Sequence, residues 1–280
     1  MTLLRSILFG IIQGLTEFLP VSSSGHIAIF QSLFDTDLGD GSLSFIVLLH
    51  LGTLIAVFIV YRKDIAELVR AFFSLCGKIV KGPPKLSELT VYERMVIYVA
   101  VATLPLIPAS FLEDKIAFIS ARIWAVGIIL LINAVLLYFS DRFASEKRPP
   151  EKVSAGNAFI VGIMQMFAVL PGLSRSGSTI TAGLAQGFTR EYAVRFSFIL
   201  SIPAILGACV LDLPDFISET VSSGDSAQLM IYFAGASAAM LVGIAAMKLL
   251  IYISKKSNFR AFSYYSAAAG TAAIIAGVLR

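Results

Sequence analysis

Two short stretches of the chain combine serine with ionisable side chains beside apolar runs. In LPVSSSGH, three consecutive serines stand between Glu17 and His26. In LPGLSRSGST, serines flank Arg175. If the apolar runs enter a membrane, ionisable residues within them are energetically costly and mark functional sites by default. The two stretches are therefore the first candidates for a site that performs chemistry.

The residue types suit a group that carries phosphate. The guanidinium of Arg175 binds phosphate oxygens in pairs, and hydroxyl groups bond the remaining oxygens. Glu17 repels an anion, so it needs a cation, a proton or a hydroxyl partner, which indicates metal coordination or acid–base catalysis. His26 is a candidate acid, base or nucleophile, and Ser23 is a candidate nucleophile. The alternative is a plain serine turn beside a structural histidine, which the combination of Glu17, His26 and Arg175 disfavours.

The two stretches belong to an internal repeat. GIIQGLTEFLPVSSSG, residues 10–25, aligns with GIMQMFAVLPGLSRSG, residues 162–177, and the outer glycines are equally spaced in both. Ser23 stands where Arg175 stands in the second copy. Convergent turn chemistry is the weaker explanation of this match. The pooled candidate residues are Gln13, Glu17, Ser22, Ser23, Ser24, His26, Gln165, Ser174, Arg175, Ser176, Ser178 and Thr179.

The elements that position these residues are predicted to be membrane helices. Of the 280 residues, 57% are hydrophobic and 14% are charged, against about 25% charged residues in a soluble domain. The basic residues lie in loops between apolar spans, so we expect no binding to nucleic acid. Six stretches are long enough to cross a bilayer, namely Leu43–Tyr61, Met95–Leu112, Ile123–Phe139, Phe196–Leu211, Leu229–Ile253 and Ala261–Leu279.

The basic loops orient these spans. Loops 62–85, 142–152 and 255–260 follow the first, third and fifth spans and are rich in lysine and arginine, whereas the other loops are acidic or mixed. The positive-inside rule places the basic loops in the cytoplasm and both termini outside. Apolar residues recur at helical spacing within the first basic loop. They predict a helix near 64–80 that lies on the membrane surface or is a solvated loop helix.

Two further apolar segments, 3–33 and 156–187, carry the serine stretches in their middle. If segment 156–187 crossed the membrane, the basic loops on either side of it would lie on opposite faces, so it is predicted to enter and return as a re-entrant hairpin. The segment 3–33 invites the same interpretation. Each hairpin precedes three spans. Because three is an odd number of crossings, the second half of the chain is inverted relative to the first.

The predicted fold is therefore an all-α polytopic membrane protein with six transmembrane helices and two re-entrant helical hairpins in an inverted-topology repeat. Residues 1–145 and 151–280 form the two repeats within one membrane domain. The hairpins then meet near the midplane, where helix N-termini favour an anion.

At these motifs the sequence resembles the bacterial undecaprenyl-diphosphate phosphatases, the bacitracin-resistance membrane family. The resemblance covers essentially the whole chain. QGLTEFLPVSSSGH matches the family's acidic/Gln-x-x-x-Glu pattern with its following serines and histidine, and LPGLSRSGST matches PGxSRSxxT. Gln13 occupies the first position of the acidic/Gln-x-x-x-Glu pattern, where an acidic residue is commonest in the family. This difference weakens only the prediction of a metal site built from two carboxylates.

The resemblance implies hydrolysis of undecaprenyl diphosphate to undecaprenyl phosphate and inorganic phosphate, which recycles the lipid carrier for peptidoglycan synthesis. It also implies a divalent cation, Mg²⁺ or Ca²⁺, bound by Glu17. The protein is then expected in the bacterial cytoplasmic (inner) membrane, with its site on the extracytoplasmic side. Carried over by position, Glu17, His26 and Arg175 are the strongest catalytic candidates. Ser23 is the proposed nucleophile, and attack by water or His26 stays open. The expected phosphate-binding residues are Gln13, Ser22, Ser24, Gln165, Ser174, Ser176 and Thr179.

Two other functions compete with hydrolysis. The inverted repeat is typical of a transporter, here a transporter or flippase of a phosphorylated polyprenyl lipid, and a structural membrane protein is the third alternative. Glu17, Ser23 and His26 together favour hydrolysis, because transport needs neither a nucleophile nor a base. The expected partners are a polyprenyl diphosphate, the lipid bilayer and a second copy in a homodimer. His50 and Asn133, which lie within apolar spans, are expected to form helix–helix hydrogen bonds.

Overall fold

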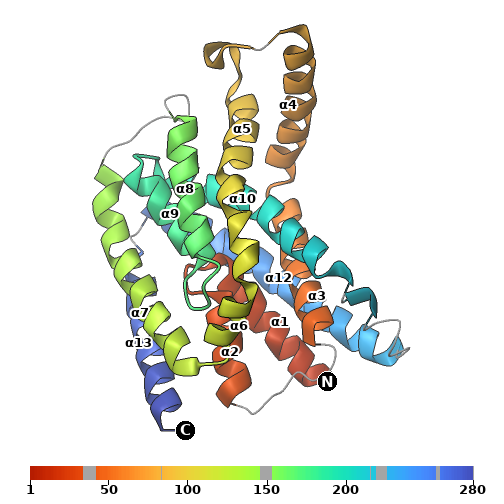
Figure 1. Cartoon of the computed structure of the whole chain (residues 1–280), viewed down its shortest axis with the longest axis vertical. Helices are drawn as coiled ribbons and strands as arrows, with labels where there is room; N and C mark the ends of the chain where they lie inside the picture. Colours follow the sequence, from red (N-terminus) through yellow and green to blue (C-terminus); the bar gives the residue numbers. More distant parts are fainter. Residues whose placement is uncertain are drawn as a thin grey trace.

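Every regular element that the computed structural model describes is a helix (Figure 1). The description covers residues 1–33, 42–82, 84–145, 153–214, 216–218, 226–256 and 259–279. Within these ranges the chain is all-α, as the sequence predicts. Most of the second basic loop, including the predicted boundary between the repeats at 146–150, lies outside the described residues.

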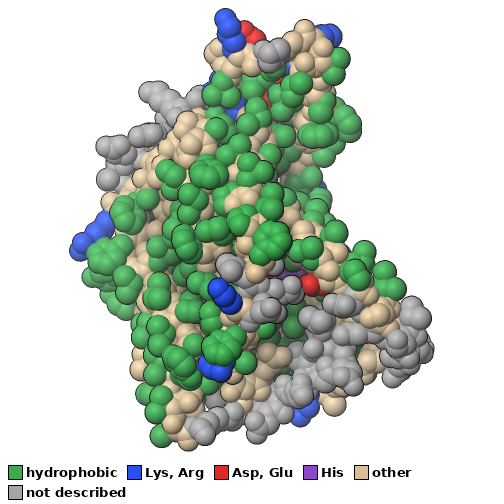
Figure 2. All heavy atoms as spheres, in the orientation of Figure 1, with side chains coloured by type: hydrophobic (Ala, Val, Ile, Leu, Met, Phe, Trp, Pro, Cys, Tyr) green, Lys and Arg blue, Asp and Glu red, His purple; other side chains and the backbone are tan. Residues whose placement is uncertain are grey.

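Long apolar helices dominate the molecule. They are α3 (Ser42–Val60), α7 (Ile123–Ser140), α10 (Arg190–Leu211), α12 (Ser226–Lys256) and α13 (Arg260–Val278). In the described part of the chain, the spans that begin at Ile123, Arg190, Ser226 and Arg260 are long and apolar enough to cross a membrane. The pair formed by α3 and α4 (Arg62–Lys81), bent by 85°, adds a fifth if it counts as one span. Hydrophobic side chains cover most of the face in Figure 2, so the helices fit a multi-pass membrane protein.

The segment between α4 and α7 is broken into short helices. After η1 (Leu86–Glu88) and α5 (Val91–Thr103), the chain continues as η2 (Leu104–Leu106), η3 (Pro108–Leu112) and α6 (Glu113–Ser120). The sequence predicts one span at Met95–Leu112, whereas the α-helix ends at Thr103. Pro105 and Pro108 explain the difference, because proline lacks the N–H that an α-helix needs and clashes with the preceding turn.

Each serine stretch connects two helices that form a hairpin. The first hairpin comprises α1 (Leu3–Phe18) and α2 (Ser23–Leu33), and the second comprises α8 (Ala155–Phe167) and α9 (Arg175–Ala185). Gly10 of α1 lies against the backbone of α12, where an added Cβ would stand 2.1 Å from the Gly235 oxygen. Gly162 of α8 lies against α5 in the same way, 2.4 Å from the Ala102 oxygen. The first glycine of each repeat copy thus permits close packing of its hairpin on a neighbouring helix.

Charged residues join the basic loops at one end of the helices. Asp141, which begins η4 (Asp141–Ser145), pairs with Arg190 of α10 at 2.7 Å and accepts the Phe259 N–H at 3.0 Å. Arg195, further along α10, forms an ion pair with Asp64 of α4. Residues in or beside the three basic loops therefore lie close together around the start of α10, and the side of the membrane on which they lie stays a prediction.

The helix predicted near 64–80 exists as α4, and it packs beside α5. Glu93, in the first turn of α5 before the apolar run begins, is 1% exposed. Its carboxylate accepts from Lys78 Nζ at 2.8 Å, from Ser74 Oγ at 2.8 Å and from the Thr90 N–H at 2.8 Å. The hydrogen bond from Lys78 is the main reason that the pKa of Glu93 falls from its ordinary value of 4.5 to about 2.

This lowered pKa predicts acid sensitivity of the α4–α5 pair. The folded-state pKa lies below the unfolded one, so the stabilisation is complete above pH 4.5 and is lost as the pH falls toward 2. We expect it to amount to about 1–3 kcal/mol, because Lys78 is partly exposed and solvent screens the pair. Thermal unfolding in detergent across this pH range, for the wild type and Glu93→Gln, measures it. A wild type and variant with the same pH dependence would contradict the prediction.

Candidate active site

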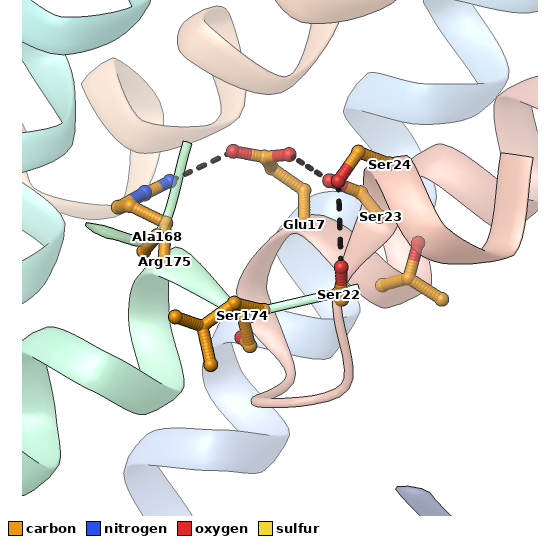
Figure 3. A pocket seen from close by; sticks show the side chains of 9 residues that line it. Glu17, Ser22, Ser23, Ser24, Ala168, Ser174 and Arg175 are labelled. Carbon is orange, nitrogen blue, oxygen red and sulfur yellow. Dashed lines mark hydrogen bonds and ion pairs between the residues drawn. The ribbon is translucent and has the colours of Figure 1, made fainter. Parts of the chain in front are cut away.

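The two serine stretches meet in one cavity. Its lining comes from the end of α1, the start of α2, the residues before α9 and the first residue of α9. Figure 3 shows Glu17 between Arg175 on one side and the serines of the first stretch on the other. The lining residues are Thr16, Glu17, Ser22, Ser23, Ser24, Ala168, Leu173, Ser174 and Arg175. Two hairpins far apart in the sequence thus build one polar site, as the repeat predicts.

Equivalent serines stand directly before the second helix of each hairpin. Ser22 Oγ accepts the Gly25 N–H at 3.2 Å, and Ser174 Oγ accepts the Gly177 N–H at 3.1 Å. Each serine therefore caps a helix N-terminus near the cavity. The helix dipole gives each of these ends a partial positive charge. Ser22 has φ of 74°, a left-handed conformation that is uncommon for serine and occurs preferentially at functional sites.

Glu17 is the centre of the site. Its Oε1 atom accepts from Arg175 Nη2 at 2.8 Å, and its Oε2 atom accepts from Ser23 Oγ at 2.7 Å and Gln13 Nε2 at 3.1 Å. The exposed fractions of the two side chains are only 14% for Arg175 and 8% for Glu17. Ser23 and Arg175 are the first residues of α2 and α9, so equivalent positions of the two hairpins bind opposite oxygens of one carboxylate.

The other predicted phosphate-binding residues divide into two groups. Ser22, Ser24 and Ser174 line the cavity. The remaining four residues are buried and do not line the cavity. They are Gln13, Gln165, Ser176 and Thr179.

The buried group makes contacts that shape the loops. Ser176 Oγ donates to the Leu19 oxygen at 3.3 Å, which links the second hairpin to the first. Thr179 Oγ1 donates to the Arg175 oxygen at 2.8 Å and lies 2.7 Å from Ser197 Oγ. Among the described residues, the buried side-chain amide of Gln165 has no hydrogen-bond partner. Ser176 and Thr179 therefore support the cavity from outside its lining.

His26 lies one turn into α2, and protein groups contact both of its ring nitrogens. Nδ1 is 2.7 Å from the Ser22 oxygen, and Nε2 is 2.8 Å from the hydroxyl of Tyr265 in α13. A carbonyl oxygen only accepts hydrogen bonds, so Nδ1 carries the proton, and in the neutral ring Nε2 accepts from Tyr265. His26 is not among the residues that line the cavity. The structure thus brings Glu17, Ser23 and Arg175 together, and His26 contacts the serine turn through the Ser22 oxygen.

Two polar residues of the apolar spans have neighbours that the sequence alone does not show. Asn133 contacts Ser266 of α13, as the predicted helix–helix bond requires, and it also contacts both serine stretches. His50 Nδ1 lies 3.0 Å from the Ile46 oxygen of its own helix, and the bond of His50 to a neighbouring helix stays a prediction.

Comparison with known proteins identifies the family. A model of the family described as bacitracin resistance protein BacA matches residues 6–272. The chain belongs to this family. An undecaprenyl-diphosphatase from Alkaliphilus metalliredigens is 39% identical over 280 residues, which are 100% of both chains. An undecaprenyl-diphosphatase from Methanobrevibacter smithii is 40% identical over 268 residues, 95% of this chain and 94% of the relative.

The donor atoms of this BacA-family site fit a divalent cation only if a substrate phosphate supplies some of the ligands. Nowhere in the described ranges do three or more His, Cys, Asp or Glu side chains lie together as a ready cation site. Glu17 is the one carboxylate among the lining residues. Mg²⁺ is commonly bound by one or two carboxylates with substrate phosphates and water. The residues therefore suit a cation that a phosphate-bearing substrate shares, with Glu17 as its protein ligand, and they do not build a closed protein cage.

Proposed function

We propose that the chain is a membrane phosphatase that hydrolyses undecaprenyl diphosphate to undecaprenyl phosphate and inorganic phosphate. Through this reaction it recycles the lipid carrier for peptidoglycan synthesis. The observation that carries the proposal is the contact of one buried carboxylate, Glu17, with both a serine hydroxyl and an arginine at two helix N-termini. The names of the relatives support the same activity.

The substrate's diphosphate binds between the two helix N-termini. Arg175 exchanges its contact with Glu17 for two oxygens of the terminal phosphate, because a guanidinium fits a phosphate in pairs. The positive ends of α2 and α9 favour the same anion. Ser22, Ser24 and Ser174 line the cavity and hold the remaining oxygens. The undecaprenyl tail stays among the lipids, which suits a polar cavity in an otherwise apolar protein.

Ser23 is the nucleophile that this geometry favours. Its Oγ already donates to Glu17 Oε2 at 2.7 Å, so the carboxylate is placed to take the proton. Oγ then bonds to the terminal phosphorus, and the bond to the bridging oxygen breaks with its electron pair leaving on undecaprenyl phosphate. Water next attacks the phosphorus of the phosphoserine and the bond between Ser23 Oγ and phosphorus breaks. Glu17 returns its proton to Ser23 Oγ, and inorganic phosphate leaves with the oxygen and both protons of the water.

His26 has a supporting role in this proposal. Because both of its nitrogens contact protein groups, it orients the Ser22 carbonyl and hence the serine turn, while Tyr265 fixes its ring. A divalent cation, Mg²⁺ or Ca²⁺, held by Glu17 and the substrate, would neutralise charge that develops on the phosphates. The supporting role of His26, the divalent cation and a homodimer are all parts of the proposal.

The membrane arrangement is part of the proposal. We propose six spans and two re-entrant hairpins in the inverted repeat 1–145 and 151–280, with the chain in the cytoplasmic (inner) membrane and the cavity open to the extracytoplasmic side. The matching contacts of Gly10 and Gly162 support the repeat, since each begins a copy and each packs against the backbone of a neighbouring helix. The clustering of the basic loops at one end supports the orientation.

The inverted repeat also suits a flippase, so the deciding experiment must separate the two functions. Purified protein in detergent is given undecaprenyl diphosphate, and inorganic phosphate and undecaprenyl phosphate are both measured. Hydrolysis predicts equal amounts of the two products. Movement of the intact lipid across vesicles, with no phosphate released, would support the transporter instead.

Arg175→Lys is expected to lower kcat/KM about 10²-fold, because lysine keeps the charge and loses the paired contact with phosphate. The same phosphate-release assay measures the effect. Arg70→Lys is the matched control, since Arg70 lies on α4 with its side chain 74% exposed. Equal rates for Arg175→Lys and Arg70→Lys would remove Arg175 from the proposed site.

A further inference from the structure

Asn133 is a buried polar residue in the middle of an apolar helix. It lies in α7 and has no exposed surface. Its Nδ2 atom donates to the Pro20 oxygen at 3.1 Å and to Ser266 Oγ at 3.2 Å, and its Oδ1 atom accepts the Ser174 N–H at 3.1 Å. Both amide N–H groups and the amide oxygen are therefore in use.

Two of these three partners are backbone groups of the serine stretches. Pro20 stands two residues before Ser22 in the first stretch, and Ser174 caps α9 in the second. Because the Pro20 carbonyl only accepts and the Ser174 N–H only donates, the side-chain amide has a single workable orientation. One side chain from a third element thus contacts both halves of the cavity at once.

The position of this contact bears directly on the distance between the catalytic groups. Pro20 and Ser22 lead into α2, whose first residue is Ser23, and Ser174 leads into α9, whose first residue is Arg175. Glu17 bonds to both of these first residues. A relative shift of the two helix starts would lengthen one of the two bonds. A displacement of about 1 Å at a reacting group is enough to lower a rate about 10²-fold.

We propose that Asn133 is a positioning residue that sets the separation of the two serine stretches, and through it the Ser23–Glu17–Arg175 geometry. It acts through these residues and does not touch the substrate. The proposal rests on the proposed phosphatase function. The alternative is that Asn133 only joins α7 to α13 through Ser266.

Two variants separate positioning from helix–helix bonding. Asn133→Leu has a similar volume and suits an apolar helix, but it leaves the Pro20 carbonyl and the Ser174 N–H without this partner. Ser266→Ala removes the contact to α13 and keeps both contacts to the serine stretches. We expect Asn133→Leu to lower kcat about 10- to 100-fold with KM within about twofold of the wild type, because chemistry and not binding depends on the separation. We expect Ser266→Ala to keep kcat within about twofold.

The measurements are kcat and KM for phosphate release, with thermal unfolding of each variant in the same detergent. Asn157→Leu is a matched control on α8, where the side-chain amide contacts Gln186 and Ser154, neither of which lines the cavity. Asn133→Ser, which is small and uncharged, replaces Asn133→Leu if that variant does not fold, and the same fall in kcat is expected.

The outcomes are distinguishable. Wild-type kcat in Asn133→Leu or Asn133→Ser, or an equal loss in Ser266→Ala, overturns the positioning role. If the wild type itself releases no phosphate, the proposed function is what fails.

Discussion

Glu17→Gln is expected to lower kcat about 10³-fold. Glutamine has nearly the shape of glutamate, but it is a poor proton acceptor for Ser23 and carries no charge for Arg175. Removal of a positioned general base commonly lowers a rate by about 10²- to 10⁴-fold. Phosphate release from the purified variant measures the loss. Glu67→Gln is the matched control, because Glu67 lies on α4 with its side chain 45% exposed.

The result must be separated from loss of the fold. Glu17→Gln leaves Arg175 as a buried charge without its carboxylate, and breaking a buried pair in this way destabilises a protein by about 3–5 kcal/mol. Thermal unfolding of the variant therefore accompanies the assay. Glu17→Asp keeps the charge and withdraws it by one methylene, so we expect an intermediate rate. A folded Glu17→Gln protein with wild-type kcat would show that Glu17 takes no proton.

Ser23→Ala is expected to reduce kcat at least about 10³-fold if its hydroxyl attacks phosphorus. The wild type, stopped rapidly with acid during turnover, should then carry phosphate on Ser23, which mass spectrometry of the peptide detects. Ser237→Ala is the matched control, because Ser237 is an exposed serine of α12 whose hydroxyl bonds to its own helix at Phe233.

Water is the alternative nucleophile, and the same variant tests it. If Ser23 only holds the substrate, Ser23→Ala loses one hydrogen bond, and a fall of about 10-fold or less is expected. No phosphoserine would then accumulate. Retained turnover together with unmodified Ser23 would assign the attack to a water activated by Glu17.

Much of the fold follows from the sequence because apolar length is a strong signal. The predicted span Ile123–Phe139 matches α7 within one residue at its end, and Ala261–Leu279 matches α13 within one residue at each end. The break after Thr103 is missed when apolar residues are counted without weighing Pro105 and Pro108. Those prolines are visible in the sequence, so the signal was present.

The candidate site follows from the sequence only in part. The repeat predicts that the two serine stretches meet, and it pairs Ser23 with Arg175. Spacing along the chain does not show which side chains line the cavity, and His26, a predicted site residue, contacts the lining residue Ser22 without being a lining residue itself. Tyr265 comes from the last helix and has no local signal. Asn133 has a weak sequence signal, because it is a polar residue within an apolar span. Its hydrogen-bond partners, however, depend on tertiary packing.

The ion pair between Glu17 and Arg175 makes the site self-neutralising before any ligand arrives. An incoming phosphate does not add a partner for the guanidinium; it displaces one already held at 2.8 Å. The Glu17 carboxylate therefore competes with any phosphate for the guanidinium of Arg175. A diphosphate has two charged groups and should overcome this competition more readily than free phosphate, so we expect inorganic phosphate to inhibit the enzyme only weakly.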